Sequence, residues 1–284
     1  MKLAKSKYYI FIIILSVVVF SPTLESSNAS EREKTVCGFL KERLLFQFWS
    51  WATPKPDSSR VSNLPNVESI SFKTSDNKTL YGYKYLSHDE NNQRTEPKGY
   101  VLMAIGNAML SDQIIRCLKS FAADSYDVYI YDYRGYGNSE GSRRINAIIE
   151  DYKEIVASLN KKYNKKLLYG ISFGGIVILN VIGGGFDFDA AVIDSTPSYL
   201  SSYGCPKTID SIEHLPDDSS KLLVITGDND KVLNNDMTKD LRETAKMKGA
   251  KIIKGVTFSH PFMDKSREIH LERMKIIRDF LFNK

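Results

Sequence analysis

The feature that most constrains the fold of this chain is a repeated exchange of short apolar runs with segments of helical spacing. The apolar runs lie at 99–104, 128–131, 166–169, 190–193 and 221–225, and the helical segments at 112–121, 145–159, 175–181, 236–248 and 269–282. Nearly continuous apolar runs of this length suit strands that are buried on both faces of a sheet. Strand and helix in alternation along most of the chain predict a mostly parallel sheet with helices on both faces.

A hairpin is expected ahead of this pattern. Residues 67–73 and 79–86 alternate polar and apolar side chains around the turn-forming sequence Ser75-Asp76-Asn77. A further short strand is expected at 251–254. We assign residues 67–284 to one α/β domain, since a chain of 284 residues is long enough for one sizeable core.

The N-terminus has the layout of an export signal. Lys2, Lys5 and Lys7 precede the apolar run 8–20, and small residues follow at 27–29. This order is typical of a signal peptide that is removed near residue 30. A membrane-spanning helix needs about 20 apolar residues, so the run is short for a permanent anchor. We expect residues 1–29 to direct export to the periplasm or the exterior, with an uncleaved anchor as the alternative.

Residues 30–66 form a separate N-terminal segment that is rich in aromatic side chains. Its centre, Phe39–Trp51, is mostly apolar and is broken by a short charged stretch at 41–43. We expect this stretch to pack against the α/β domain and to cover an exposed sheet edge. The alternative is peripheral contact with a membrane surface through its aromatic side chains.

The chain has three cysteines, so at least one thiol stays outside any disulfide within the chain. Cys117 sits among apolar residues and is expected to pack as a small apolar side chain. A disulfide between Cys37 and Cys205 is compatible with an oxidising compartment, but the sequence alone does not select it.

Charge and motif content exclude several function classes. The net charge is +5, and part of it comes from the lysines of the first few residues. Nucleic-acid-binding proteins concentrate basic residues on one face, and no such concentration is evident in the sequence. There is also no metal-ligand cluster, and the glycines at 183–185 lack the lysine of a phosphate-binding loop. We expect no metal, no cofactor and no nucleic-acid partner, and we leave the oligomeric state open.

The sequence Gly170-Ile171-Ser172-Phe173-Gly174 matches the pattern G-x-S-x-G. Its context makes the match informative, because an apolar strand precedes it and an apolar helix follows. A serine on the tight turn between such elements is forced outward at the edge of the sheet, and the flanking glycines relieve the crowding. Ser172 is therefore the candidate nucleophile.

A serine on such a turn needs an acid and then a histidine, in that order along the chain. Of the four histidines, His88 precedes the serine, His214 precedes the strand expected to supply the acid, and His270 lies within the last helix. His260 remains, in a loop that follows the strand at 251–254. The candidate acids each follow a predicted strand: Asp194, Asp228 and Asp230.

Two backbone N–H groups would have to stabilise the oxyanion that forms when the serine attacks a carbonyl carbon. One belongs to the residue after the nucleophile, Phe173. The other is expected from the loop after the strand 99–104, where Gly106-Asn107-Ala108 forms a small turn. We choose Asn107 as that donor.

At this point the sequence resembles the α/β-hydrolase superfamily over residues 67–284. The segment YDYRGYGNSEG at 131–141 is similar to a signature of a group that includes the α/β-hydrolase-domain protein depalmitoylases and uncharacterised bacterial relatives. In that group the motif shapes a loop beneath the active site, so Asp132 and Arg134 are expected to be structural. The turn at 106–108 resembles the group's His-Gly-Asn-Ala turn, except that Ile105 stands in place of the histidine.

The resemblance implies an α/β-hydrolase fold and a Ser172–His260–Asp230 triad. It favours Asp230 over Asp228 because the acid of the family stands three residues after the glycine, here Gly227. The implied reaction is hydrolysis of an ester, thioester or related acyl bond through an acyl-enzyme. The short region 194–220, where relatives insert a lid, predicts a short cap and an open site. A peptidase of the same fold and a catalytically inactive binding protein remain the alternatives.

Overall fold

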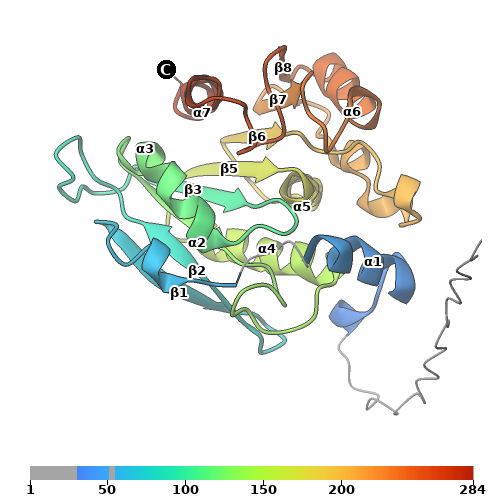
Figure 1. Ribbon diagram of the computed structural model, residues 1–284, viewed down its shortest axis with the longest axis horizontal. Coiled ribbons are helices and arrows are strands. Elements are labelled where there is room, and N and C mark those ends of the chain that lie inside the picture. Colours follow the sequence, from blue (N-terminus) through green and yellow to red (C-terminus); the bar gives the residue numbers. More distant parts are fainter. Residues whose placement is uncertain (1–30, 51–54, 284) are drawn as a thin grey trace, which may run out of the picture.

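A computed structural model describes residues 31–50 and 55–283 of the chain. At its centre is one sheet of eight strands in the order β1-β2-β4-β3-β5-β6-β7-β8 (Figure 1). The strands are β1 Val67–Lys73, β2 Thr79–Tyr85, β3 Gly99–Ala104, β4 Tyr126–Tyr131, β5 Lys165–Ile171, β6 Ala190–Asp194, β7 Leu222–Gly227 and β8 Lys251–Gly255. The pairs β1–β2 and β2–β4 are antiparallel, and all other neighbours are parallel.

Helices cover both faces of this sheet (Figure 1). The α-helices are α1 Phe39–Ser50, α2 Ser111–Ile114, α3 Lys119–Ala122, α4 Ile145–Asn160, α5 Phe173–Gly183, α6 Asn235–Met247 and α7 Arg267–Leu281. The 3₁₀ turns are η1 Glu31–Glu33, η2 Ser58–Arg60, η3 Ile115–Leu118, η4 Ser201–Tyr203, η5 Lys207–Ile209 and η6 Ser211–His214. On one face α3 meets the end of α7 through the rings of Phe121 and Phe282, and on the other α4 lies against α5. The predicted fold class, a mostly parallel sheet with helices on both sides, is confirmed.

Burial explains why the strand pattern could be read from the sequence. Every residue of β3, β4 and β6 is buried, as an apolar run in the middle of a doubly covered sheet requires. The edge strand β1 alternates between exposed and half-buried side chains, which is the pattern of a strand with one solvated face. The central strands therefore supply the core, and their carboxyl ends lie along one edge of the sheet.

The segment 112–121 departs from its helical prediction. It is broken into α2, the 3₁₀ turn η3 and α3. Ile115, Leu118 and Phe121 are all fully buried and stand three residues apart, and a 3₁₀ turn keeps such residues on one line. The same turn directs Cys117 outward, so its thiol is free and exposed and the prediction that it packs in the core is wrong.

The described part of the N-terminal segment packs on the α/β domain through α1. Phe46 is buried, whereas Phe39, Leu40 and Leu44 are 60%, 67% and 50% exposed. The predicted packing holds for one face of this helix, whereas the expected cover of a sheet edge and membrane contact by the other face stay predictions. The expected signal peptide at 1–29 and the end of the aromatic stretch at Trp51 lie outside the described residues.

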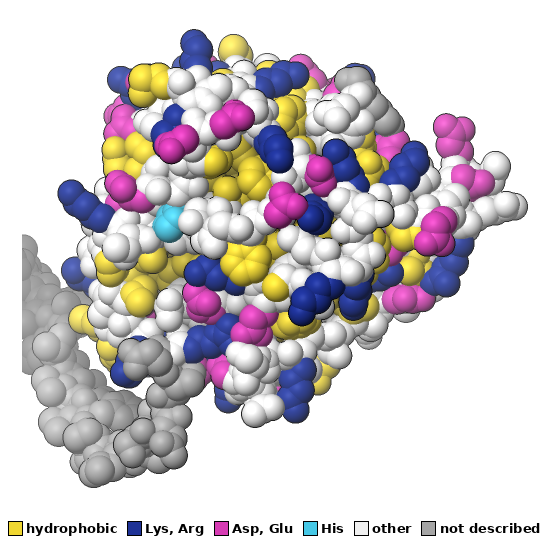
Figure 2. All heavy atoms as spheres, turned by 180° about the vertical axis from the view of Figure 1, so that it is seen from behind, with side chains coloured by type: hydrophobic (Ala, Val, Ile, Leu, Met, Phe, Trp, Pro, Cys, Tyr) yellow, Lys and Arg dark blue, Asp and Glu magenta, His cyan; other side chains and the backbone are white. Residues whose placement is uncertain are grey.

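The surface carries charges of both signs. On the face shown in Figure 2, Lys and Arg side chains are interspersed with Asp and Glu and are not gathered into one basic patch. None of the helices within the described ranges combines the length and apolar character that a bilayer span requires.

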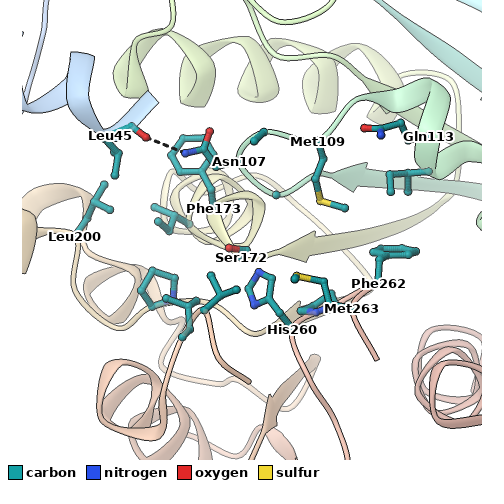
Figure 3. A pocket seen from close by; sticks show the side chains of 18 of the residues that line it. Leu45, Asn107, Met109, Gln113, Ser172, Phe173, Leu200, His260, Phe262 and Met263 are labelled. Atoms are coloured by element: carbon teal, nitrogen blue, oxygen red, sulfur yellow. Dashed lines mark hydrogen bonds between the residues drawn. The ribbon is translucent and has the colours of Figure 1, made fainter. Parts of the chain in front are cut away.

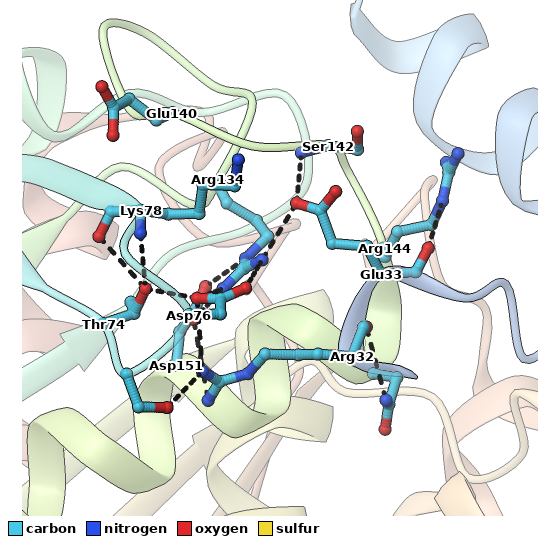
Figure 4. Close-up of polar contacts among 12 residues, drawn as sticks. Arg32, Glu33, Thr74, Asp76, Lys78, Arg134, Glu140, Ser142, Arg144 and Asp151 are labelled. Carbon is cyan, nitrogen blue, oxygen red and sulfur yellow. Dashed lines mark hydrogen bonds and ion pairs between the residues drawn. The ribbon is translucent and has the colours of Figure 1, made fainter. Parts of the chain in front are cut away.

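A buried charge cluster joins the N-terminal segment to the sheet (Figure 4). Arg134 is fully buried; its Nε donates to Asp151 Oδ2 at 2.7 Å and its Nη1 to Asp76 Oδ2 at 2.9 Å. Its Nη1 also donates to Glu33 Oε1 at 3.1 Å. Burial alone would raise the pKa of Asp76, but hydrogen bonds from Arg134 and Thr74 outweigh it and lower the pKa to about 2. Arg134 thus ties together η1, the β1–β2 turn and α4.

We expect Arg134→Met to lower the free energy of unfolding by about 3–5 kcal/mol, because it removes the hydrogen bonds of Arg134 to the fully buried Asp151 carboxylate. Urea unfolding at neutral pH, followed by circular dichroism, measures this change. Arg94→Met is the matched control, since the Arg94–Glu68 pair is exposed. The control should cost less than about 1 kcal/mol. Equal losses in the two variants would contradict the assignment of Arg134 as the anchor.

Candidate active site

Ser172 occupies the turn between β5 and α5. Its φ of 52° and ψ of −119° lie where a non-glycine residue is rarely found, and such strain persists only when the surroundings fix it. Its backbone N–H donates to the carbonyl of Asp194 at 2.8 Å, which joins the turn to the end of β6. The side chain is thereby held at the carboxyl edge of the sheet, as the sequence predicted.

Close packing explains the two glycines of the G-x-S-x-G sequence. A methyl group on Gly170 would lie 2.6 Å from the carbonyl oxygen of Gly174. One on Gly174 would lie 2.0 Å from the carbonyl oxygen of Ala104, at the end of β3. Both distances are far below van der Waals contact, so the first turn of α5 can approach β5 and β3 this closely only without side chains at these positions.

His260 and Asp230 come from loops that follow neighbouring strands. Asp230 lies just after β7 and His260 after β8, and His260 Nδ1 lies 2.8 Å from Asp230 Oδ2. The other carboxylate oxygen of Asp230 accepts the backbone N–H groups of Val232 and Leu233 at 2.8 and 2.9 Å. Burial would raise the pKa of Asp230, but the contacts with His260 and these two N–H groups outweigh it and the pKa is lowered. The carboxylate is therefore ionised at neutral pH and can orient the imidazole.

The other two candidate acids have different partners. Asp228 pairs with Lys254 on β8 at 2.8 Å and is partly exposed. Asp194 is fully buried and faces Arg273 at 3.4 Å, and burial raises its pKa. Of the three aspartates, Asp230 is the one that the structure places on His260.

The remaining histidines lie away from this arrangement. His88 stacks on Tyr85, and its Nδ1 lies 2.9 Å from the carbonyl oxygen of Leu86. His214 Nε2 lies 2.8 Å from the carbonyl oxygen of Thr208, and His270 Nδ1 lies 3.9 Å from Asp264. None of these three lines the pocket described next.

Ser172 and His260 face each other in a pocket of about 500 Å³ (Figure 3). The pocket is lined mainly by apolar side chains on either side of Ser172. One side includes Leu45 and Leu200, and the other Met109, Phe262 and Met263. Among the described residues that line it, His260 is the only one of the Asp, Glu, Lys, Arg and His types.

The loop after β3 adjoins Ser172 on the side expected for the oxyanion. A methyl group on Gly106 would lie 3.6 Å from Cβ of Ser172, and Asn107 and Phe173 both line the pocket. Within the described residues, neither the N–H of Asn107 nor that of Phe173 donates to a backbone carbonyl. Both groups are thus available to a ligand, and their roles as donors stay predictions.

Ile105, which stands in place of the histidine of the resembled turn, is held from the core side. Its side chain is fully buried, and its carbonyl oxygen accepts the hydroxyl of Tyr133 at 2.6 Å. Asp132 anchors the other end of the loop, because its Oδ1 accepts the backbone N–H of Ser111 at 2.7 Å. Asp132 and Arg134 thus contact the structure beneath the site and not the pocket.

Two contributions were missed by the sequence analysis. Arg273 on α7 donates to the carbonyl of Ser259 at 2.5 Å, so it anchors the loop immediately before His260. Asp264 accepts from Arg273 at 3.2 Å and from the N–H of Ser259 at 2.9 Å. The second contribution is α1, which brings Leu45 to the pocket. Neither carries a local sequence signal, since both act through contacts between distant parts of the chain.

A search of the described residues finds no group of three or more His, Cys, Asp or Glu side chains that could hold a metal ion.

Comparison with known proteins supports the α/β-hydrolase fold. The model of the family described as serine aminopeptidase, S33 (Hydrolase_4) matches residues 95–202, which is less than half of the chain. The uncharacterised protein YfhR of Escherichia coli K12 is 25% identical over 167 residues, which cover 56% of this chain and 57% of YfhR. The match therefore spans little more than half the length of that relative.

Solved structures are similar over most of their length. The esterase Pf2001 of Pyrococcus furiosus gives a TM-score of 0.61 at 18% identity, with 81% of this chain and 96% of that chain covered. The protein XC6422 of Xanthomonas campestris, described as an a/b serine hydrolase without lid, gives 0.59 at 13% identity with the same coverage. At such low identity these structures establish the fold alone. The chain therefore has the α/β-hydrolase fold and resembles the serine hydrolases of that superfamily.

Proposed function

We propose that this protein is a serine hydrolase that cleaves an ester or thioester of an apolar acyl group. The observation that carries the proposal is the 2.8 Å contact of His260 Nδ1 with the Asp230 carboxylate, with Ser172 facing the same imidazole in an apolar pocket. An aspartate that accepts from Nδ1 leaves Nε2 free to take a proton from serine. The fold and the family model indicate a hydrolase, and the finer assignment to this bond type is our inference.

The proposed reaction begins with attack of Ser172 Oγ on the carbonyl carbon while His260 Nε2 takes the hydroxyl proton. The carbonyl electron pair moves to the oxygen, where the N–H groups of Phe173 and Asn107 stabilise it. The bond to the leaving group then breaks, and the leaving group receives the proton from His260. Water repeats the sequence on the acyl-enzyme, which releases the carboxylic acid and restores Ser172.

The lining of the pocket favours an ester or thioester over a peptide with a free amino terminus. An aminopeptidase has to pair the ammonium group of its substrate, and an unpaired charge in an apolar site is costly. Within the part of the chain that the structure describes, no Asp or Glu side chain lines the pocket. Aminopeptidase activity, which the description of the family model names, is therefore the second candidate and is tested alongside.

We expect a fluorophosphonate probe to label the protein at Ser172, and p-nitrophenyl esters to be hydrolysed in preference to aminoacyl amides. Ser172→Ala and His260→Ala should each remove most of the activity, because attack and proton removal belong to one step. The double variant should lose little more than either single variant. Kinetics of the three variants on one activated ester measure this.

Labelling confined to a different residue, or a near-normal rate in Ser172→Ala, would overturn the proposed function. Faster cleavage of aminoacyl amides than of esters would shift the assignment to the peptidase. Complete inertness toward probe and substrates would leave the inactive binding protein as the better description.

Asp230→Asn should lower kcat by roughly 10⁴-fold, because the imidazole would then favour the wrong tautomer. Asp228→Asn is the matched control, since Asp228 pairs with Lys254 and not with His260. It should leave kcat nearly unchanged. Steady-state kinetics of the two variants at neutral pH decide between them, and a reversed ranking would transfer the acid role to Asp228.

We also propose that the protein is exported and rests on a membrane surface through α1. Support comes from the lysines ahead of the apolar run 8–20 and from the Cys37–Cys205 disulfide, a bond typical of oxidising compartments. The exposed face of α1 adds Leu40 and Leu44 beside the basic Lys41, a combination that suits anionic lipid.

N-terminal sequencing of the protein from fractionated cells should find a mature chain that begins near residue 30. Part of it should sediment with membranes, and Leu40→Ser combined with Leu44→Ser should reduce that part several-fold, because burial of leucine drives such binding. Met1 still present on the membrane-bound protein would favour the uncleaved anchor. An unchanged sedimented fraction in the double variant would rule out α1 as the contact.

A further inference from the structure

Helix α1 lies outside the sheet, yet it reaches the residues that flank Ser172 (Figures 1 and 3). Its Leu45 side chain lines the pocket, and the carbonyl oxygen of Leu45 accepts the side-chain amide Nδ2 of Asn107 at 3.1 Å. The side-chain oxygen of Asn107 accepts the hydroxyl of Tyr136. The Asn107 amide is therefore held on both sides, by α1 and by the loop that follows β4.

The next residue of α1 contacts the second expected donor. Phe46 is 2% exposed, and its ring meets that of Phe173 edge-on at 5.6 Å between centroids. It also packs against Tyr136 at 6.4 Å, the same tyrosine that bonds Asn107. Two adjacent residues of α1 thus support both residues whose N–H groups would stabilise the oxyanion.

The position of α1 is itself fixed by a covalent bond. Cys37, just before the helix, forms a disulfide with Cys205, 168 residues later in the sequence. Cys205 follows η4, whose Tyr203 lines the pocket together with Leu200. Glu42, in the first turn of the helix, also binds the residues just ahead of it, because its Oε1 accepts the N–H groups of Val36 and Cys37 at 2.6 and 3.0 Å. The disulfide therefore joins α1 to the short cap across one side of the pocket.

We propose that α1 is a positioning element of the site and that the Cys37–Cys205 disulfide holds it against the oxyanion donors, so that the thiol–disulfide state of the chain sets its catalytic rate. The proposal rests on the proposed function. Reduction by a dithiol or a phosphine breaks the S–S bond with two electrons and two protons and gives two thiols, while the reductant is oxidised. The freed helix no longer holds Leu45 and Phe46 in place, and Asn107 and Phe173 lose their support.

This arrangement predicts a loss in kcat with little change in KM. Oxyanion donors act on the transition state, and removal of one donor costs about 10²–10³-fold in kcat. Loosening their support should cost less, about 10- to 100-fold. The pH dependence of the rate should keep its midpoint, because the contact between His260 and Asp230 is formed by other loops. A general loss of structure would instead lower the fraction of enzyme molecules that are folded and active.

The test compares the oxidised protein, the protein reduced with a phosphine, and the variant Cys37→Ser/Cys205→Ser on one p-nitrophenyl ester across pH. Both cysteines are buried, so the reductant has little access to the bond. If the bond resists reduction, the double serine variant, which cannot form it, still provides the protein without the disulfide. Cys117→Ser, which removes the exposed free thiol, is the matched control. Circular dichroism checks that each sample is folded at the assay temperature. Reoxidation of the phosphine-reduced wild-type protein should restore its kcat to that of the oxidised protein.

A second measurement does not depend on activity. Hydrogen exchange followed by mass spectrometry should become faster in the peptide that contains residues 105–109 when the bond is reduced or absent, and remain unchanged in β4. An active enzyme whose kcat and exchange are the same in both states would overturn this inference and leave the proposed function intact. An oxidised protein without Ser172-dependent activity would overturn the proposed function. In that case the exchange measurement still tests the present inference, which equal hydrogen exchange at 105–109 in the oxidised and reduced protein would contradict.

Discussion

The site depends on how closely the first turn of α5 approaches the end of β3. Gly174 lies so near the carbonyl oxygen of Ala104 that no side chain fits between them. Ser172, two residues earlier on the same turn, is held at a positive φ of 52°. The N–H of Phe173, at the first position of the helix, has no partner within the helix, as at any helix N-terminus. Close packing of this one turn therefore places the nucleophile beside a backbone N–H group.

Parallel strand order then brings the remaining groups to the same edge. β5, β6, β7 and β8 are consecutive neighbours that run in one direction, so the residues that follow them lie side by side. Ser172 follows β5, Asp230 follows β7 and His260 follows β8. Between them, the carbonyl of Asp194 at the end of β6 accepts the N–H of Ser172. Residues far apart in the sequence become neighbours because open α/β sheets gather ligand-binding loops at the carboxyl ends of their strands.

Local patterns explain how much of this could be predicted. The central strands and the helices at 145–159, 236–248 and 269–282 follow from periodicity, because burial on one or both faces leaves a direct record in the sequence. The choice among Asp194, Asp228 and Asp230 does not follow from periodicity, since all three end buried strands. The family resemblance favours Asp230, and the contacts separate all three: Arg273 lies beside Asp194, Lys254 beside Asp228 and His260 beside Asp230.

The parts that could not be predicted are held by long-range contacts. The broken helix around η3 and the outward Cys117 arise from the tight packing of Ile115 and Leu118 in the core. The support that α1 gives to Asn107 joins residues 62 positions apart in the chain. No window of sequence contains both partners of such a contact. A short aromatic stretch can indicate that something will be buried, but not which loop it will support.

Two buried arginines show how such contacts are fixed. Arg134 joins η1, the β1–β2 turn and α4, and Arg273 joins α7, the end of β6 and the loop before His260. Buried ion pairs contribute little net stability, because desolvation of the charges offsets their attraction. A catalytic geometry needs loops that are held to about 0.5 Å, by packing and by hydrogen bonds together. Apolar contacts are non-directional, so the directional part of this support comes from charged hydrogen bonds. Because both arginines lie behind the pocket and not in it, the loops are fixed while the cavity itself stays apolar.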